Sequence, residues 1–424
     1  MNTDYHLRIA DKLLQNALRT SGAVQIVGPK WCGKTTTAEQ FAREAVYFQD
    51  PDKRVSYRQM VSEKPSLLLM GEKPLLLDEW QDFPQMWDAV RFAVDRSREF
   101  GQFILTGSSL PRSEDEEQIR HSGVGRFSRV RMRPMSLFES GESNGSISLT
   151  DIFEGRDVYG KSSLSLEDIA YVLARGGWPA SVNANDEYAV SRAREYVESI
   201  IETDISKVDG IDKNPKRVRL LMRSLSRNES TAASLTTLQA DMVSEEDGQL
   251  STNTIPIYLN ALRRLYVLEE QEVWAQAVRS KVAIRTTPVR RFCDPSVAAA
   301  LLRFTPDKML VDFNTFGLFF ESLCVRDLRT YAEAIDGDVF FYKDARGLEC
   351  DAIIELADGR WGAVEIKLEQ SLVPKAVDSL MKIASEVRSQ HAGEPSFLMV
   401  LTSGEVGYKR EDGVYVVPIG CLCP

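Results

Sequence analysis

The stretch that decides the fold of the first part of this chain is Gly28-Pro29-Lys30-Trp31-Cys32-Gly33-Lys34-Thr35, which has the form G-x-x-x-x-G-K-T. The run 23–27 before it is apolar and predicts a short buried strand, and the run 36–43 after it predicts the first turns of a helix. Glycines let backbone N–H groups close around a phosphate, and the helix N-terminus adds a favourable partial charge. We therefore expect a phosphate-binding loop between a strand and a helix.

The side chains of this loop predict how a nucleotide is held. Lys34 is expected to reach the β- and γ-phosphates, and the Thr35 hydroxyl is expected to ligate Mg²⁺. An ordinary glycine turn between a strand and a helix is the alternative, which the four fixed residues at fixed offsets disfavour. The predicted nucleotide-binding residues are Gly28, Pro29, Lys30, Trp31, Cys32, Gly33, Lys34, Thr35 and Thr36.

A second motif lies downstream, where the apolar run Leu75-Leu76-Leu77 ends in Asp78 and Glu79. This is the pattern of a Walker B strand when it follows a phosphate loop. Asp78 is expected to hold Mg²⁺ through its water shell, together with Thr35, and Glu79 to orient or deprotonate the attacking water. An apolar strand followed by two carboxylates is common by itself, so the prediction depends on the loop upstream.

Two further positions are candidates for contact with the reacting phosphate. The run 102–106 predicts another strand, and Thr106 or Ser108 at its end is the candidate sensor of the γ-phosphate or the water, with a plain strand-to-turn junction as the alternative. Arg126 follows a glycine-containing loop and is the candidate arginine finger, in cis or from a neighbouring subunit. A solvated basic edge explains Arg126 equally well.

Length and composition bound the remaining possibilities. A chain of 424 residues is long enough for about two to four domains, and 43% hydrophobic with 27% charged residues is typical of a globular protein. The net charge of −10 means that any binding of nucleic acid must come from local basic patches. No apolar run approaches a membrane span and no signal peptide is evident, and the six cysteines are scattered. We expect a cytoplasmic protein with reduced thiols that does not enter a membrane.

Together these motifs resemble a family of prokaryotic AAA+ ATPases with a C-terminal domain of restriction-endonuclease-like type. The resemblance covers nearly the whole chain and implies a cytoplasmic protein that binds and hydrolyses ATP with Mg²⁺. The resemblance implies ATP rather than GTP as the nucleotide, and no GTP-specific N-K-x-D motif is evident in the ATPase half of the chain. Besides the loop, it rests on Tyr5…Arg8-Ile9-Ala10-Asp11, Leu75-Leu76-Leu77-Asp78-Glu79-Trp80-Gln81, Phe103-Ile104-Leu105-Thr106-Gly107-Ser108-Ser109, Gly125-Arg126 and Arg133-Pro134-Met135-Ser136-Leu137.

The predicted fold class is α/β, in four segments. Residues 1–138 are expected to form the AAA+ P-loop domain, with alternating strands and helices around a parallel sheet. Residues 139–165, rich in Ser, Gly, Asp and Glu, are expected to be a linker or surface excursion. Residues 166–285 are expected to be helical with a winged helix, and 286–424 to be the restriction-endonuclease-like domain.

The middle segment holds candidates for contact with nucleotide or nucleic acid. Arg175, beside Gly176-Gly177-Trp178-Pro179, is a candidate nucleotide sensor, although capping a helix end is the simpler explanation. The run 255–265 has apolar residues at helical spacing and lies where a DNA-reading helix of a winged helix would lie. A basic cluster upstream is a candidate phosphate-contacting stripe, with a solvated face, a lid or a protein contact as the alternatives. It consists of Lys213, Lys216, Arg217, Arg219, Arg223 and Arg227.

A second group of chemical residues lies near the C-terminus. Asp351 on one expected strand is followed by Glu365-x-Lys367 on another, and period-2 geometry places Glu365 and Lys367 on one face. This is the pattern of the restriction-endonuclease superfamily, in which Asp351 and Glu365 would share Mg²⁺, Lys367 would polarise the water, and Glu321 would complete the site from a helix. Alternating charges on an exposed strand give the same pattern.

Two functions therefore remain open. The leading hypothesis is a Mg²⁺-dependent ATPase whose nucleotide state controls a nucleic-acid-binding or nuclease-like C-terminal module. The alternative is a nucleotide-dependent switch or scaffold with an inactive nuclease fold that binds a protein partner. DNA or RNA, and further copies of this chain in a homo-oligomer, stay open as partners beside ATP.

Overall fold

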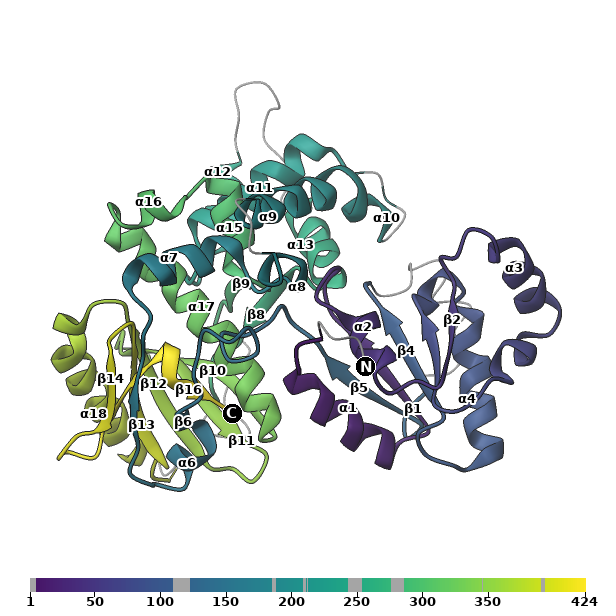
Figure 1. Cartoon of the computed structure of the whole chain (residues 1–424). Helices are drawn as coiled ribbons and strands as arrows, with labels where there is room; N and C mark the ends of the chain where they lie inside the picture. Colours follow the sequence, from purple (N-terminus) through teal and green to yellow (C-terminus); the bar gives the residue numbers. More distant parts are fainter. Residues whose placement is uncertain are drawn as a thin grey trace.

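The chain folds into an N-terminal parallel sheet, a helical middle unit and a C-terminal mixed sheet (Figure 1). None of the helices described is both long and apolar enough to cross a membrane. The computed structural model describes residues 5–109, 123–184, 188–208, 211, 213–242, 254–275, 286–344, 346–389 and 393–424.

In the N-terminal unit, five strands lie in the order β2-β3-β4-β1-β5, and every neighbouring pair is parallel. Apolar side chains of α1 and α2 cover one face of this sheet, and those of α4 and η1 cover the other. Because both faces are covered, the central strands are buried throughout and mostly apolar. The predicted parallel sheet is confirmed. The elements are α1 (Ile9–Thr20), β1 (Ala23–Val27), α2 (Lys34–Glu39), β2 (Glu44–Tyr47), α3 (Arg54–Glu63), η1 (Pro65–Leu69), β3 (Leu75–Asp78), η2 (Trp80–Asp82), α4 (Gln85–Ser97), β4 (Phe103–Gly107) and β5 (Phe127–Arg131).

The middle unit is mostly helical and contains one short antiparallel pair, β8 with β9. Three helices, α11, α12 and α13, precede this pair, which is the element order expected of a winged helix; that interpretation stays a prediction. The elements are α7 (Leu166–Arg175), α8 (Pro179–Val182), α9 (Ala189–Ser199), the π-helix η3 (Ile200–Asp204), α10 (Ile205–Lys207), α11 (Pro215–Arg227), α12 (Leu235–Asp241), α13 (Thr254–Arg264), β8 (Leu268–Gln271), β9 (Val289–Phe292), α15 (Pro295–Leu302) and α16 (Pro306–Met309).

The predicted boundary between the last two domains needs correction. Residue 285 lies outside the described residues, but the strands on its two sides, β8 and β9, pair with each other. Helix α15, which follows, packs against α7, α9 and α11 of the middle unit. The middle unit therefore continues past 285, because the apolar surface of α15 is buried among its helices rather than against the C-terminal sheet.

The C-terminal unit is a seven-stranded sheet in the order β10-β11-β12-β13-β15-β14-β7. Strands β10, β11 and β12 form an antiparallel meander, and β13 then pairs parallel to β12 after the crossover through α18. The long helix α17 packs on this sheet and also on α1 of the first unit (Figure 1). The elements are α17 (Phe313–Ala334), β10 (Gly337–Lys343), β11 (Glu349–Leu356), β12 (Trp361–Lys367), η4 (Gln370–Leu372), α18 (Val373–Ser389), β13 (Phe397–Thr402), β14 (Val406–Lys409), β15 (Tyr415–Pro418), η5 (Ile419–Cys421) and β16 (Leu422–Cys423).

The stretch 139–165, expected to be a linker or surface excursion, instead contributes two strands and a helix that pack with the C-terminal unit. Strand β7 (Tyr159–Lys161) pairs with β14 at the edge of the C-terminal sheet, and β6 (Ile147–Ser148) pairs with β16. Between them, α6 (Leu149–Phe153) buries its apolar side chains in the largest hydrophobic core. The strands are only two or three residues long and their partners lie more than two hundred positions away in the chain, so the local composition did not predict them.

Candidate functional site

Parallel pairing brings the chemical residues of the first unit to one edge of the sheet. The loop follows the end of β1, Asp78 ends β3, and Gly107 ends β4, so all three lie at the carboxyl edge. The loop itself needs its glycines. Gly33, at the start of α2, has φ 99°, and a Cβ on Gly28 would lie 2.0 Å from the Met132 carbonyl oxygen. These two positions favour glycine for geometric reasons.

Thr35 and Asp78 lie in direct contact at this edge. The Thr35 hydroxyl donates to Asp78 Oδ1 at 2.7 Å, and Thr106 donates to the same oxygen at 2.6 Å. Burial raises the pKa of Asp78, and these two hydrogen bonds oppose that rise. A hydroxyl beside a carboxylate is an oxygen donor set that Mg²⁺ prefers. The residues therefore fit the predicted Mg²⁺ role of Thr35 and Asp78.

Glu79 is held in a defined position. It adopts φ 54°, its backbone N–H donates to Thr106 Oγ1 at 3.2 Å, and its carboxylate accepts from Ser108 Oγ at 2.8 Å and from Gln81. Thr106 is fully buried, and its hydroxyl bonds to the Asp78 carboxylate and to the Glu79 N–H. The two sensor candidates therefore each bond one Walker B carboxylate.

A cavity of about 780 Å³ opens beside the loop, large enough for a small-molecule ligand. Its walls include Lys34, whose Nζ donates to the Pro29 carbonyl at 2.8 Å, and Glu79. Of the nine predicted nucleotide-binding residues, those that line it are Lys30, Trp31, Gly33, Lys34, Thr35 and Thr36. Cys32 does not line the cavity, because its side chain is fully buried.

The opposite wall of this cavity comes from the middle unit, which sequence analysis did not predict. Arg192 and Glu195 of α9 bring charges to it, and the turn at Trp178 and α8 bring apolar surface. A single arginine in a charged helix gives no local signal of a ligand site. Only the packing of the units identifies these wall residues, which are Trp178, Pro179, Ala180, Ser181, Arg192 and Glu195.

The loop is also held to the middle unit by direct contacts. Lys30 Nζ lies 2.7 Å from Asp204 Oδ1 in the π-helix η3, and the ring of Trp31 lies 5.5 Å from that of Tyr196 in α9. A single-turn π-helix is a frequent mark of functional sites. The middle unit therefore packs over the loop.

Two predicted arginines lie away from the cavity. Arg126 precedes β5, whose first residue pairs with Ala23 at the start of β1, so it lies at the edge opposite the loop, where it pairs with Asp95 at 2.7 Å. The structure thus corrects the cis arginine finger; a finger from a neighbouring subunit stays a proposal. Arg175 pairs with Glu142 at 2.6 Å and caps α7 through the Gly176 carbonyl, which matches the simpler explanation.

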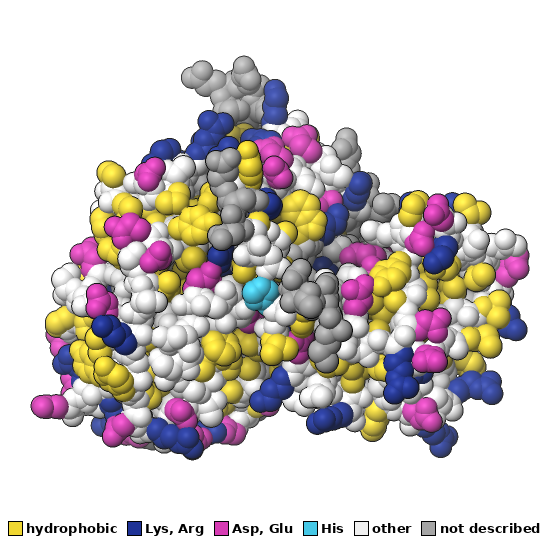
Figure 2. Space-filling view, viewed as in Figure 1, with side chains coloured by type: hydrophobic (Ala, Val, Ile, Leu, Met, Phe, Trp, Pro, Cys, Tyr) yellow, Lys and Arg dark blue, Asp and Glu magenta, His cyan; other side chains and the backbone are white. Residues whose placement is uncertain are grey.

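The basic cluster of α11 is partly neutralised. Arg219 makes two bonds to Glu198, at 2.8 and 2.6 Å, and Arg227 lies 3.6 Å from Asp241. Lys213 is buried and donates to the Ile211 carbonyl. On the face shown in Figure 2, basic and acidic side chains are interspersed. Contact with nucleic acid through α11 therefore stays a prediction.

The C-terminal residues converge as expected. Lys367 Nζ lies 2.9 Å from Asp351 Oδ2 and 2.7 Å from Glu365 Oε2. Burial alone would lower the pKa of Lys367, but the two carboxylates outweigh it and raise that pKa. Burial, and then the charge of Asp351, raise the pKa values of Glu365 and Glu321. All four residues therefore share one electrostatic site.

This site does not fit a metal ion in the arrangement described. Glu321 is paired with Arg291 of β9, and Asp351 and Glu365 are paired with Lys367. Within the described part of the chain, no group of three or more His, Cys, Asp or Glu side chains is placed to hold a metal ion. The predicted residues lie together, but their carboxylates are already paired with Arg291 or Lys367.

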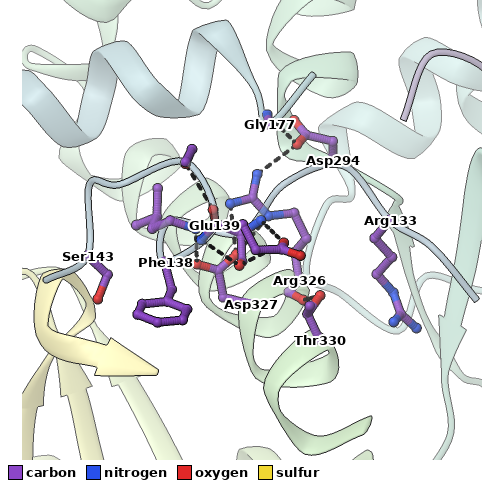
Figure 3. Close-up of polar contacts among 12 residues, drawn as sticks. Arg133, Phe138, Glu139, Ser143, Gly177, Asp294, Arg326, Asp327 and Thr330 are labelled. Carbon is purple, nitrogen blue, oxygen red and sulfur yellow. Dashed lines mark hydrogen bonds and ion pairs between the residues drawn. The ribbon is translucent and has the colours of Figure 1, made fainter. Parts of the chain in front are cut away.

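A buried joint connects the units between the two sites (Figure 3). Arg326 of α17 donates to Asp294 Oδ2 at 2.7 Å, and the same oxygen accepts from the Gly177 N–H at 3.0 Å. Asp327 accepts from the Leu137 N–H at 2.9 Å, in the segment that leaves β5. The joint fixes the turn that precedes the Trp178 wall of the cavity to the helix that carries Glu321.

Comparisons with known families agree with this division. Residues 20–140 match a family model described as AAA domain, residues 166–308 match a domain of unknown function (DUF8612), and residues 316–422 match another (DUF4143). The match and the loop geometry define the first unit as a P-loop domain of AAA type. The middle match also extends past 285, as the packing of α15 does.

Relatives and solved structures are distant. The chain is 21% identical over 415 residues to the uncharacterized proteins Rv2008c of Mycobacterium tuberculosis and Mb2031c of Mycobacterium bovis, covering 97% of this chain and 83% of each relative. It resembles the Walker-type ATPase PABY2304 of Pyrococcus abyssi (14% identity, 69% of this chain, 94% of that chain, TM-score 0.43). It also resembles AMPPCP-bound DnaA from Aquifex aeolicus (14%, 60%, 86%, 0.28).

Proposed function

We propose that this protein binds ATP with Mg²⁺ in the loop cavity and hydrolyses it, with Glu79 as general base. The observation that carries the proposal is that Lys34, Thr35 and Glu79 line one cavity, while Asp78 is bonded to Thr35. The AAA domain match over residues 20–140 supports the same nucleotide chemistry. A cavity of this size, lined by a phosphate loop, suits a nucleoside triphosphate.

Each residue has a distinct part in this reaction. The loop N–H groups and Lys34 bind the phosphates, and Thr35 with Asp78 holds the Mg²⁺ ion. When bound, the ion supplies positive charge that neutralises the phosphates. Glu79 accepts the proton of the attacking water, and Ser108 and Gln81 fix its carboxylate for that task. Thr106 fixes the positions of Asp78 and Glu79 relative to each other through its hydrogen bonds to both residues.

The middle unit completes the site as a lid. The indole of Trp178 and the exposed ring of Trp31 supply apolar surface suited to a base, and Arg192 supplies a positive charge on the wall opposite Lys34. Closure of such a lid excludes water and strengthens the charge interactions inside. A nucleotide bound in the loop would therefore contact the middle unit, so that a change of nucleotide state would alter the contacts of that unit.

Equilibrium binding of a fluorescent ATP analogue with Mg²⁺ tests the first step. Lys34→Ala should lose binding at least about a hundredfold, because the lysine neutralises phosphate charge in a buried site. Lys53→Ala, an exposed lysine paired with Asp50, is the matched control and should bind like wild type. Unchanged binding in a folded Lys34→Ala protein would contradict the assignment of this cavity.

We further propose that the C-terminal unit is a nuclease-like module that cleaves nucleic-acid phosphodiesters under control of the nucleotide. The convergence of Asp351, Glu365 and Lys367 supports this function, because a lysine between two carboxylates is suited to stabilising a charged intermediate. The alternative, a switch or scaffold with an inactive nuclease fold, predicts the same geometry without cleavage.

Cleavage of duplex DNA, single-stranded DNA and RNA in Mg²⁺ or Mn²⁺ buffers, with and without ATP, separates the two alternatives. Wild type should cut at least one substrate, and Asp351→Asn should lose the activity. Asp358→Asn, an exposed aspartate in the turn after β11, is the control and should cut normally. No cleavage under any condition would favour the switch or scaffold function.

A further inference from the structure

Ser181 of α8 is a buried polar side chain on the wall of the loop cavity. Its side chain is 1% exposed, and among the described residues its hydroxyl oxygen is buried without a hydrogen-bond partner. It nevertheless lines the cavity, on the wall that the middle unit supplies. A buried hydroxyl without a partner costs free energy, so a serine at this position calls for an explanation.

The Ser181 hydroxyl does not make the bond that a helical serine usually makes. A serine in a helix commonly donates to a carbonyl three or four residues before it. Ser226 of α11 is equally buried and donates in this way to the Met222 carbonyl at 2.8 Å. In α8 the Trp178 carbonyl instead accepts from the backbone N–H groups of Ser181 and Val182, at 2.8 and 2.9 Å. The hydroxyl is therefore available to a group inside the cavity.

The turn that presents Ser181 is held from behind by α15. The Gly177 N–H donates to Asp294 Oδ2 at 3.0 Å (Figure 3), and Trp178 Nε1 donates to Ser296 Oγ at 3.0 Å. Because these two contacts fix the turn before α8, the hydroxyl is positioned before a ligand arrives. Such preorganisation lowers the entropy cost of a contact with the ligand.

The surroundings of Ser181 suit a nucleobase rather than a phosphate. The residues next to it on this wall, Trp178, Pro179 and Ala180, carry no charge. Trp178 offers only ring surface to the cavity, because its single side-chain N–H is already bonded to Ser296. A base has apolar faces and a polar edge, so an apolar wall with one available hydroxyl is complementary to it.

We propose that Ser181 is a specificity-determining residue that donates a hydrogen bond to an acceptor nitrogen on the edge of the adenine base. The inference rests on the proposed function, because it assumes that ATP occupies the loop cavity. It deepens that function, since the loop binds the phosphates that all nucleoside triphosphates share, whereas Ser181 contacts the base. Removal of one such bond from a buried site should weaken binding about five- to tenfold.

Competition against the fluorescent ATP analogue, with Mg²⁺ and the full chain, tests this contact with three ligands. They are ATP, dideoxy-ATP, which lacks both ribose hydroxyls, and inorganic tripolyphosphate, which lacks base and ribose. Ser181→Ala should weaken the binding of ATP and dideoxy-ATP at least about fivefold and leave that of tripolyphosphate unchanged. Ser226→Ala is the matched control, because it removes an equally buried hydroxyl that is bonded within its own helix, and it should change none of the three affinities.

A second variant keeps the contact testable if Ser181→Ala does not fold. Ser181→Cys nearly keeps the side-chain volume but has a much weaker donor, so it should show the same selective loss. Unchanged ATP affinity in a folded variant would overturn the inference. A loss confined to ATP would assign the contact to the ribose, and an equal loss for tripolyphosphate would assign it to the fold; either result would overturn the base contact.

The same titrations separate this inference from the proposed function. Wild type that binds ATP and tripolyphosphate, with Ser181→Ala unaffected, would refute the base contact alone. Wild type that binds none of the three ligands would refute nucleotide binding in the loop cavity and the base contact with it.

Discussion

Glu269 shows how individual side chains couple the first unit to the rest of the molecule. It is buried among Arg131 and Arg133 of the first unit, at 3.1 and 3.0 Å, and Arg329 of α17, at 2.9 Å. Burial alone would raise the pKa of Glu269, but the charges of these arginines outweigh it and hold the pKa well below its usual range. The carboxylate is therefore ionised wherever the protein is folded near neutral pH.

Replacement of this carboxylate should destabilise the protein in a pH-dependent way. Because the folded pKa is depressed, the stabilisation is fully present above the unfolded value near 4.5 and is lost as pH falls below it. Glu269→Gln should lower the unfolding free energy by about 3–5 kcal/mol at pH 7, since it leaves buried arginines unpaired. In urea titrations this difference should shrink in acid. Glu272→Gln, an exposed neighbour, should change stability by less than about 0.5 kcal/mol.

The sequence predicted which residues lie together where a motif fixes both residue type and spacing. Lys34, Thr35, Asp78 and Glu79 lie together as expected because strand order in a parallel sheet brings motif ends to one edge. Arg192 was missed because its role depends on how the middle unit packs over the loop, which leaves no local pattern.

At the scale of elements, the short pieces between 139 and 165 bury more apolar surface than their composition indicates. Helix α6 is one turn long, yet Leu149 and Ile152 are fully buried. Its capping is also local and specific, because Ser148 accepts from the Thr150 N–H. We infer that this segment is part of the C-terminal core.

Leu149→Ala measures that contribution. The substitution removes fully buried methyl groups and leaves a cavity, so it should lower the unfolding free energy by about 2–5 kcal/mol in urea titrations. Leu7→Ala removes the same atoms from a side chain that is 82% exposed, and should cost less than about 0.5 kcal/mol. Equal, small effects of the two substitutions would return this stretch to the role of a linker.

The predictions of elements failed for a common physical reason. The strands of the first unit have apolar runs long enough to be predicted from periodicity, and the C-terminal strands that carry Asp351 and Glu365 were expected for the same reason. Strands β6 and β7 are short and pair with strands more than two hundred positions away in the chain. Pairing over such separations is a tertiary effect that no local window contains.

At the scale of the whole molecule, buried contacts run without interruption from the loop to α17. Arg8 donates to the carbonyls of Cys32 in the loop and of Arg133 beyond β5, each at 2.8 Å. Arg133 in turn pairs with Glu333 of α17 at 2.8 Å. These contacts link the loop to the helix that also carries Glu321.

A finger from another subunit predicts dependence on assembly. Arg126 lies at the edge opposite its own loop, so it would act on the site of a neighbouring subunit. Arg126→Ala should therefore lower hydrolysis per chain by about a thousandfold, because each site loses the arginine of its neighbour. Mixing Arg126→Ala with Glu79→Gln should then restore part of the activity, since one chain supplies the arginine and the other the base. Arg96→Ala is the control and should hydrolyse normally, because Arg96 is an exposed arginine of α4 that lies over the ring of Phe92. Full activity of Arg126→Ala alone would exclude the finger.

Single-turnover hydrolysis by Glu79→Gln tests most directly whether the protein hydrolyses ATP in the loop cavity with Glu79 as the general base. The variant should bind ATP with about wild-type affinity and hydrolyse it at least about a hundredfold more slowly. Glu39→Gln, an exposed carboxylate at the end of α2 that bonds to Tyr47, is the control and should keep the wild-type rate. Wild-type hydrolysis by Glu79→Gln, with ATP binding verified, would contradict the account.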